Sequence, residues 1–144
     1  MTPARHLLCV AVGAGAVLSL ASAPAALAAP ERFVSPSRNI GCIGTSAFVR
    51  CDIAQTRADP PPRPASCRLD WGMAFEVERR GRGHGLCAGD TALPSPGQRV
   101  RVLRYGTTIR LGNGLRCTSR RTGLTCLNRP GHGFFLSRGG IRVF

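Results

Sequence analysis

Two histidines stand in the same local setting, in the segments Gly83-His84-Gly85 and Gly131-His132-Gly133. Two imidazoles beside an arginine are suited to acid–base cleavage of RNA, because one imidazole removes a proton, the other returns one, and the guanidinium stabilises the phosphate charge. Glycine is common in this chain, so the alternative is that each histidine lies in an exposed turn without a catalytic role. A small secreted ribonuclease or phosphodiesterase that uses His84 and His132 is therefore one of two functional hypotheses.

Other catalytic signatures are missing from the sequence. The chain has no G-x-S-x-G nucleophile elbow. It also has no pair of cysteines separated by two to four residues, the spacing of zinc fingers and ribbons. We therefore expect no metal and no cofactor, and we favour a protein that is not an enzyme.

Arginine supplies all of the 20 lysine-plus-arginine positions, against seven acidic side chains, and the formal net charge is +13. A guanidinium binds phosphate and carboxylate groups bidentately, although a GC-rich genome also favours arginine over lysine. The net charge predicts attraction to acidic polymers, such as an anionic envelope polymer, and a merely solvated basic surface is the alternative. The candidate anion-binding residues are Arg79, Arg80, Arg82, Arg120 and Arg121.

Aromatic residues are too few for the stacking platform that reads single-stranded nucleic acid. The whole chain has six Phe, one Trp and one Tyr. Base stacking on aromatic rings supplies much of the affinity in such sites. We therefore expect no specific nucleic-acid readout.

Six cysteines follow residue 28, and four of them form two pairs with the same spacing. Eight residues separate Cys42 from Cys51, and eight separate Cys117 from Cys126. If each pair lies on facing strands of a hairpin, the Cα atoms are ~4.5–5.5 Å apart, within disulfide range. Six cysteines allow fifteen connectivities. The spacing favours Cys42–Cys51, Cys67–Cys87 and Cys117–Cys126.

Residues 1–28 have the parts of a secretory signal peptide. Arg5 supplies the positive start, an apolar run covers 7–20, and Ala26-Leu27-Ala28 is a small-residue cleavage pattern. The run is shorter than the ~20 residues that span a bilayer, and an uncleaved anchor is the alternative. We expect a helical Sec-type signal peptide over 1–28, cleavage near Ala28, and a secreted or envelope-associated mature chain without a transmembrane span.

The remaining residues, 29–144, are enough for one domain. Short apolar runs bounded by Gly, Pro and Asn predict strands rather than helices. The predicted hairpins are 40–43 with 48–53, and 115–119 with 124–128 around a four-residue turn, 120–123. Further predicted strands are 75–78, 100–105, 107–111, 134–137 and 141–144, whereas 79–85 is predicted as a loop. The fold class is therefore all-β: a small disulfide-stapled domain of antiparallel hairpins, as a sandwich or an open barrel.

Several blocks of the chain occur in the same order in a known group of proteins. They are Phe33-Val34-Ser35-Pro36-Ser37-Arg38-Asn39-Ile40-Gly41-Cys42, Val49-Arg50-Cys51-Asp52, Asp70-Trp71-Gly72, Cys87-Ala88-Gly89-Asp90-Thr91, Leu103-Arg104-Tyr105-Gly106 and Gly131-His132-Gly133-Phe134. Through them the chain resembles an uncharacterised family of small secreted six-cysteine bacterial proteins, a domain of unknown function. The resemblance implies a shared fold and cysteine pattern but no activity. Arg38 departs from it, because glycine is expected there.

The sequence thus favours a secreted or envelope-associated, non-enzymatic module of unknown ligand, with a basic surface suited to anionic partners.

Overall fold

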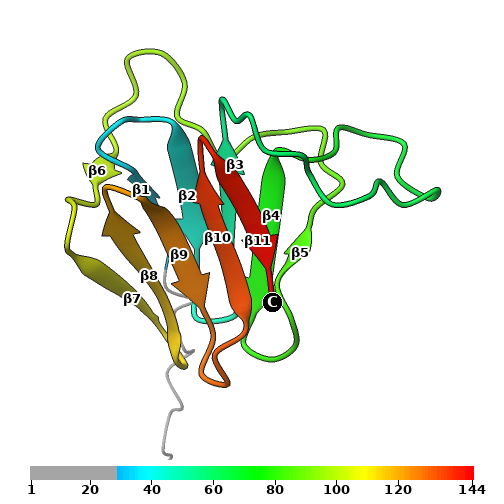
Figure 1. The fold of residues 1–144 in the computed structure, drawn as a ribbon. Coiled ribbons are helices and arrows are strands. Elements are labelled where there is room, and N and C mark those ends of the chain that lie inside the picture. The colour runs from blue at the N-terminus through cyan, green and yellow to red at the C-terminus, as the bar shows by residue number, and fades with distance from the viewer. Residues whose placement is uncertain (1–28) are drawn as a thin grey trace, which may run out of the picture.

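The computed structural model describes residues 29–144, and the signal peptide expected over 1–28 lies outside the described residues. Two β-sheets pack face to face over one core (Figure 1). The first sheet contains β1 (Glu31–Val34), β2 (Ile40–Gly44), β3 (Phe48–Ile53), β4 (Ala74–Glu78), β5 (His84–Gly85) and β6 (Arg101–Val102). The second sheet contains β7 (Thr108–Gly112), β8 (Leu115–Arg120), β9 (Gly123–Leu127), β10 (Gly133–Ser137) and β11 (Gly140–Val143).

The strand order is β5-β4-β3-β2-β1-β6 in the first sheet and β11-β10-β9-β8-β7 in the second. Neighbouring strands are antiparallel, except that β6 pairs with β1 in parallel. The prediction of an all-β, disulfide-stapled domain is confirmed. No helix among residues 29–144 has the length and hydropathy to cross a membrane.

Alternation along each strand sorts the side chains between the core and the outside. In β8, Leu115 and Cys117 are fully or nearly buried, whereas Arg116 and Arg120 belong to the opposite face. The core contains both sheets: Phe75 of β4 and Phe134 of β10 approach with ring centroids 6.4 Å apart.

Two cross-strand disulfides meet at the centre of this core. Cys42 faces Cys51 in the β2–β3 ladder, and Cys117 faces Cys126 in the β8–β9 ladder. Both pairs have Cα atoms 4.1 Å apart. The Sγ atoms of Cys51 and Cys126 lie 3.7 Å apart, so one disulfide of each sheet packs against the other. The two hairpins with equal spacing are thus stacked on each other.

The third disulfide, Cys67–Cys87, lies outside the core and has Cα atoms 5.6 Å apart. It joins the long proline-rich connection between β3 and β4, which extends away from the sandwich in Figure 1, to the segment after β5. The Trp71 indole also holds this connection, because its Nε1 donates to the Pro61 carbonyl oxygen at 2.8 Å. The three bonds are the pairs that the spacing favoured. They indicate an oxidising, extracytoplasmic environment.

Some local predictions were wrong. Residues 79–85 were predicted as a loop, but His84–Gly85 forms strand β5, because it pairs with the exposed edge of β4. In the run 100–105 only Arg101–Val102 is a strand. The turn predicted over 120–123 is tighter, because Arg120 pairs with Gly123 and extends the ladder.

The departure at Arg38 has a structural explanation. Arg38 lies in the turn between β1 and β2 and has φ 56°, the left-handed region that glycine adopts without a Cβ penalty. The turn is closed by a hydrogen bond from the Arg38 amide to the Ser35 carbonyl oxygen at 2.8 Å. The backbone therefore keeps the conformation that a glycine would take.

Because two of the three disulfides are buried in the core, we expect removal of different bonds to lower the free energy of unfolding by different amounts. A loop-entropy argument gives each bond ~3 kcal/mol, slightly more for Cys67–Cys87 because it closes a longer loop. Replacing Cys117 and Cys126 together by Ala also removes packed sulfur atoms from the core, which costs further free energy. We expect the Cys117→Ala/Cys126→Ala variant to lose more free energy of unfolding than the Cys67→Ala/Cys87→Ala variant, measured by urea denaturation. The reverse order would mean that sulfur packing contributes little.

Candidate anion-binding surface

The five candidate arginines separate into two groups. Arg79, Arg80 and Arg82 lie in the β4–β5 loop, at the lower end of the sandwich in Figure 1. Arg120 and Arg121 lie at the β8–β9 turn, at the upper end. These residues therefore do not form one site.

A groove of ~790 Å³ lies at the lower end, where loops of both sheets meet. Arg79, Arg80 and Arg129 line it together with the carboxylates of Glu76 and Glu78. Burial raises the pKa of Glu76 above its ordinary value, because the charged form is poorly solvated there. The groove thus mixes both signs of charge and is a poor site for a polyanion.

A buried asparagine organises this end. Asn128 is fully buried, and its Nδ2 donates to the Glu78 and Gly81 carbonyl oxygens at 3.1 and 2.8 Å. Its Oδ1 accepts from the His132 amide at 2.9 Å. The side chain therefore fixes the β4–β5 loop of one sheet to the β9–β10 loop of the other.

The two histidines lie at the ends of the same two loops: His84 is the first residue of β5, and His132 directly precedes β10. Gly83 and Gly133 pack backbone against backbone, so closely that a Cβ on Gly83 would collide with the Gly133 carbonyl oxygen. Their amides donate to one acceptor, the Phe144 carbonyl oxygen, at 3.1 and 2.7 Å. The Gly-His-Gly segments are therefore neighbours. Both His84 and His132 are exposed, and His84 Nε2 lies 3.9 Å from Glu76 Oε1.

The outer face of the second sheet carries a set of arginines, of which only Arg120 was a candidate from the sequence. It is called the arginine face below. Its members are the outward-facing Arg110, Arg116, Arg120 and Arg142.

Strand pairing arranges the arginine face in rows. Arg110 of β7 is the direct partner of Arg116 of β8. The neighbouring row runs across all five strands. It contains Thr108, Thr118, Thr125, Phe135 and Arg142. The hydroxyls of Thr108 and Thr118 lie 2.8 Å apart, and the Arg142 guanidinium lies 4.7 Å from the Phe135 ring centroid. The face therefore offers guanidinium and hydroxyl donors at the ~4.8 Å spacing of strands.

No carboxylate neutralises the arginine face from its own sheet. All acidic residues precede the second sheet; they are Glu31, Asp52, Asp59, Asp70, Glu76, Glu78 and Asp90. Among residues 29–144, Arg50 alone of the arginines forms an ion pair. Two features of the sequence indicate the arginine face. Arginines alternate with apolar residues over 108–120, and no Asp or Glu follows residue 90.

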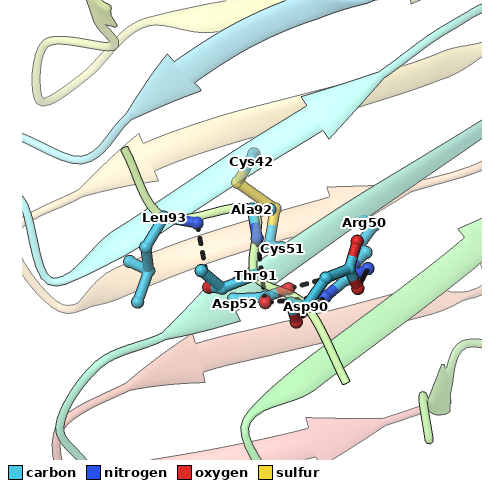
Figure 2. Close-up of polar contacts among 8 residues, drawn as sticks. All are labelled: Cys42, Arg50, Cys51, Asp52, Asp90, Thr91, Ala92 and Leu93. Carbon is cyan, nitrogen blue, oxygen red and sulfur yellow. Dashed lines mark hydrogen bonds and ion pairs between the residues drawn. A yellow bond between two sulfur atoms is a disulfide. The ribbon is translucent and has the colours of Figure 1, made fainter. Parts of the chain in front are cut away.

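Arg50 has a different role, which Figure 2 shows. Its side chain is 11% exposed, and it donates to the Asp52 carboxylate through Nε and Nη2, both at 2.9 Å. Its Nη1 and Nη2 bond to Asp90, at Oδ1 (2.8 Å) and at the carbonyl oxygen (2.7 Å). The hydrogen bonds to Asp52 and Asp90 raise the pKa of Arg50 above its ordinary value. The hydrogen-bond donors of Arg50 are therefore occupied by Asp52 and Asp90, and its guanidinium is unavailable to an external anion.

This network holds the segment after Cys87 on the outer face of the first sheet. Asp52 Oδ2 also accepts from the Ala92 amide at 3.0 Å. The Ala92–Leu93 backbone lies so close to Gly41 that a Cβ there would be 2.7 Å from the Leu93 Cα. Two blocks that carried the family resemblance, around Arg50 and around Asp90, thus meet in space and serve the fold.

Three buried sulfur atoms, of Cys51, Cys117 and Cys126, lie within 4.8 Å of one another. All three belong to disulfides, so the cluster reflects the stacked bonds rather than a set of thiolate ligands.

Comparison with known proteins gives a family but no activity. A model of a family of unknown function (DUF6636) matches residues 15–144. The chain belongs to this family. No curated protein and no solved structure matches it.

The Arg50 network predicts unequal roles for its two carboxylates. Asp52→Asn removes the buried partner of a buried guanidinium, which should cost about 3 kcal/mol of unfolding free energy. Asp90 is mostly exposed, so Asp90→Asn should cost much less. Because Arg50 lowers the pKa of Asp90, the small contribution of Asp90 is present above the carboxyl's ordinary pKa and is lost as the pH falls through the lowered value. Chemical denaturation at neutral and acidic pH measures both effects, and equal losses in the two variants at neutral pH would contradict this assignment.

Proposed function

We propose that this protein is a secreted, non-enzymatic module that binds a linear polyanion on its arginine face. The observation that carries the proposal is the direct pairing of Arg110 with Arg116 on a sheet face without carboxylates. Like charges directly opposite each other on paired strands destabilise a sheet. An anion bound between the two guanidiniums would reverse that penalty.

The shape of the face supports a polymer as the ligand. Three arginine-bearing strands, β7, β8 and β11, present their donors outward from the sheet, whereas the lower groove contains two glutamates. Repeated phosphate or sulfate groups along a chain can contact several guanidiniums at once, with affinity that depends on released counterions. The hydroxyls of Thr108, Thr118 and Thr125 in the neighbouring row supply further donors.

Export completes the proposal. The small-residue cleavage pattern ending at Ala28 and the apolar run before it fit a Sec-type signal peptide. The three disulfides fit an oxidising compartment. The partner is therefore sought among anionic polymers of the cell envelope or its surroundings.

Charge removal on the arginine face tests the proposal. The variant Arg110→Gln/Arg116→Gln/Arg142→Gln should bind long-chain polyphosphate at least ~10-fold more weakly than wild type at low salt. The negative slope of log affinity against log salt concentration should become shallower by about 2, because fewer counterions are released on binding. Fluorescence anisotropy of labelled polyphosphate over a salt series measures both quantities.

A matched control separates the face from net charge. The variant Arg32→Gln/Arg68→Gln/Arg99→Gln loses the same charge from exposed positions outside the second sheet. Its affinity for polyphosphate should stay within about threefold of wild type, and the slope of its salt dependence should change less than in the face variant. If both variants weaken binding equally, or if wild type shows no salt-dependent binding, the arginine face is not the site.

A second candidate function, RNA cleavage, is favoured by one observation: Gly83 and Gly133 pack together, so His84 and His132 come from neighbouring segments. In such a site one imidazole would act as the base and the other as the acid. His84 also has a carboxylate neighbour, Glu76.

This candidate makes a separate prediction. If the histidines are catalytic, His84→Ala and His132→Ala should each slow hydrolysis of a fluorogenic RNA by at least ~100-fold. The double variant, purified in the same way, controls for contaminating nuclease. Equal rates for wild type and the double variant would eliminate the ribonuclease.

A further inference from the structure

A small cavity lies at the upper end of the sandwich, where turns of both sheets meet. It has a volume of ~300 Å³. Arginines of the β8–β9 and β10–β11 turns and hydroxyl side chains of two turns line it. They include Arg120, Arg121, Arg138, Ser35, Ser37 and Thr122. This cavity is called the arginine pocket below.

The charge in the arginine pocket has one sign. None of the lining residues is acidic, in contrast to the lower groove with its two glutamates. Among the residues that the structure describes, Arg120, Arg121 and Arg138 take part in no ion pair. Three guanidiniums without a counterion around one cavity favour a bound anion, because guanidinium forks match tetrahedral oxyanions bidentately.

One pocket arginine is held through its side chain and another through its backbone. The Arg121 guanidinium lies over the Tyr105 ring, 5.3 Å from the centroid. The amide of Gly106, next to Tyr105, donates to the Ser119 carbonyl oxygen at 2.7 Å, which fixes this segment to the end of β8. On the other side, the Arg57 amide donates to the Arg138 carbonyl oxygen at 2.7 Å.

The hydroxyl side of the pocket is also ordered. Ser35 Oγ accepts from the Ile40 amide at 3.1 Å and lies 3.2 Å from Ser37 Oγ. Ser37 and Thr122 are exposed at the rim. A ligand that enters therefore meets hydroxyls from turns of both sheets and guanidiniums from the second sheet. The cavity is at the lower limit of volumes that small-molecule sites occupy, which suits one small charged group.

We propose that the arginine pocket binds a single phosphate or sulfate monoester, as the terminal or pendant group of the polyanion. This inference rests on the proposed function for the polymer, and the pocket and the arginine face have one arginine in common, Arg120, which borders both. The polymer lies along the face, and one end group or side group enters the pocket. The pocket thereby determines which polyanions bind. A polymer without accessible monoesters can contact only the arginine face.

Titration with phenyl phosphate and phenyl sulfate tests the pocket, because the two probes differ only in the oxyanion. Isothermal titration at constant ionic strength should show saturable 1:1 binding of at least one probe to wild type. Arg121→Gln/Arg138→Gln should weaken that binding at least ~10-fold. The control Arg68→Gln/Arg99→Gln, with the same charge change at exposed positions outside the pocket and the arginine face, should stay within about twofold of wild type.

The two probes identify the oxyanion. A phosphate monoester loses its second proton near pH ~6, so phosphate recognition should strengthen between pH ~5 and ~7.5, whereas sulfate binding should not change. Unchanged near-ultraviolet circular dichroism confirms that each variant is folded.

Failure of the pocket and failure of the proposed function give different results. Lack of saturable binding of both monoesters, or equal loss in the pocket variant and the control variant, overturns the pocket even if polyphosphate still binds the face. Saturable, pocket-dependent binding of a monoester without any binding of polyphosphate supports the pocket as a site. It contradicts the proposal that the protein binds a linear polyanion.

Discussion

The contact between two disulfides, one in each sheet, is the interaction on which the structure depends. Cys51 and Cys126 meet at 3.7 Å in the middle of a core that has few large aromatic residues. Each disulfide also joins residues directly opposite each other on paired strands, which fixes the register of that pair. Because a one-residue slip would turn every side chain of a strand to the other face, the register that buries the cysteines also decides what points outward. The arginine face is therefore a consequence of where the sulfur atoms lie.

The two sheets use charge differently. In the first sheet, acidic residues serve internal contacts: Asp52 and Asp90 bind Arg50 and hold a long connection on the outer face. The second sheet lacks acidic residues, so its arginines have no carboxylate partner within the sheet, although Arg116 donates to the Asn128 carbonyl oxygen. Packing the two sheets together keeps these roles apart, since the core between them is apolar apart from a few satisfied groups such as Asn128. A surface with uncompensated charge can exist because stability comes from sulfur bonds and burial elsewhere.

Sequence reasoning predicted the two hairpins with matched cysteines, but it missed short edge strands and the pairings between distant segments. The two hairpins with matched cysteines followed from spacing alone, because facing residues in a hairpin are near neighbours in sequence. The parallel pairing of β1 with β6 joins segments about seventy residues apart, and no local pattern indicates it. The Arg50 network was missed for the same reason, since Arg50 and Asp90 are 40 positions apart.

The candidate sites illustrate the same limit in another way. Arginine clusters along the sequence pointed to Arg79 and Arg80, but the fold places them beside Glu76 and Glu78, where their charge is partly offset. Arg110 and Arg142 are far apart in sequence and unremarkable there, yet the sheet brings them to one face. Whether a basic residue can bind an anion depends on the carboxylates near it in space, because nearby opposite charges set the local potential. For this chain the informative quantity is therefore the distribution of its few acidic residues, which leaves one whole sheet positively charged.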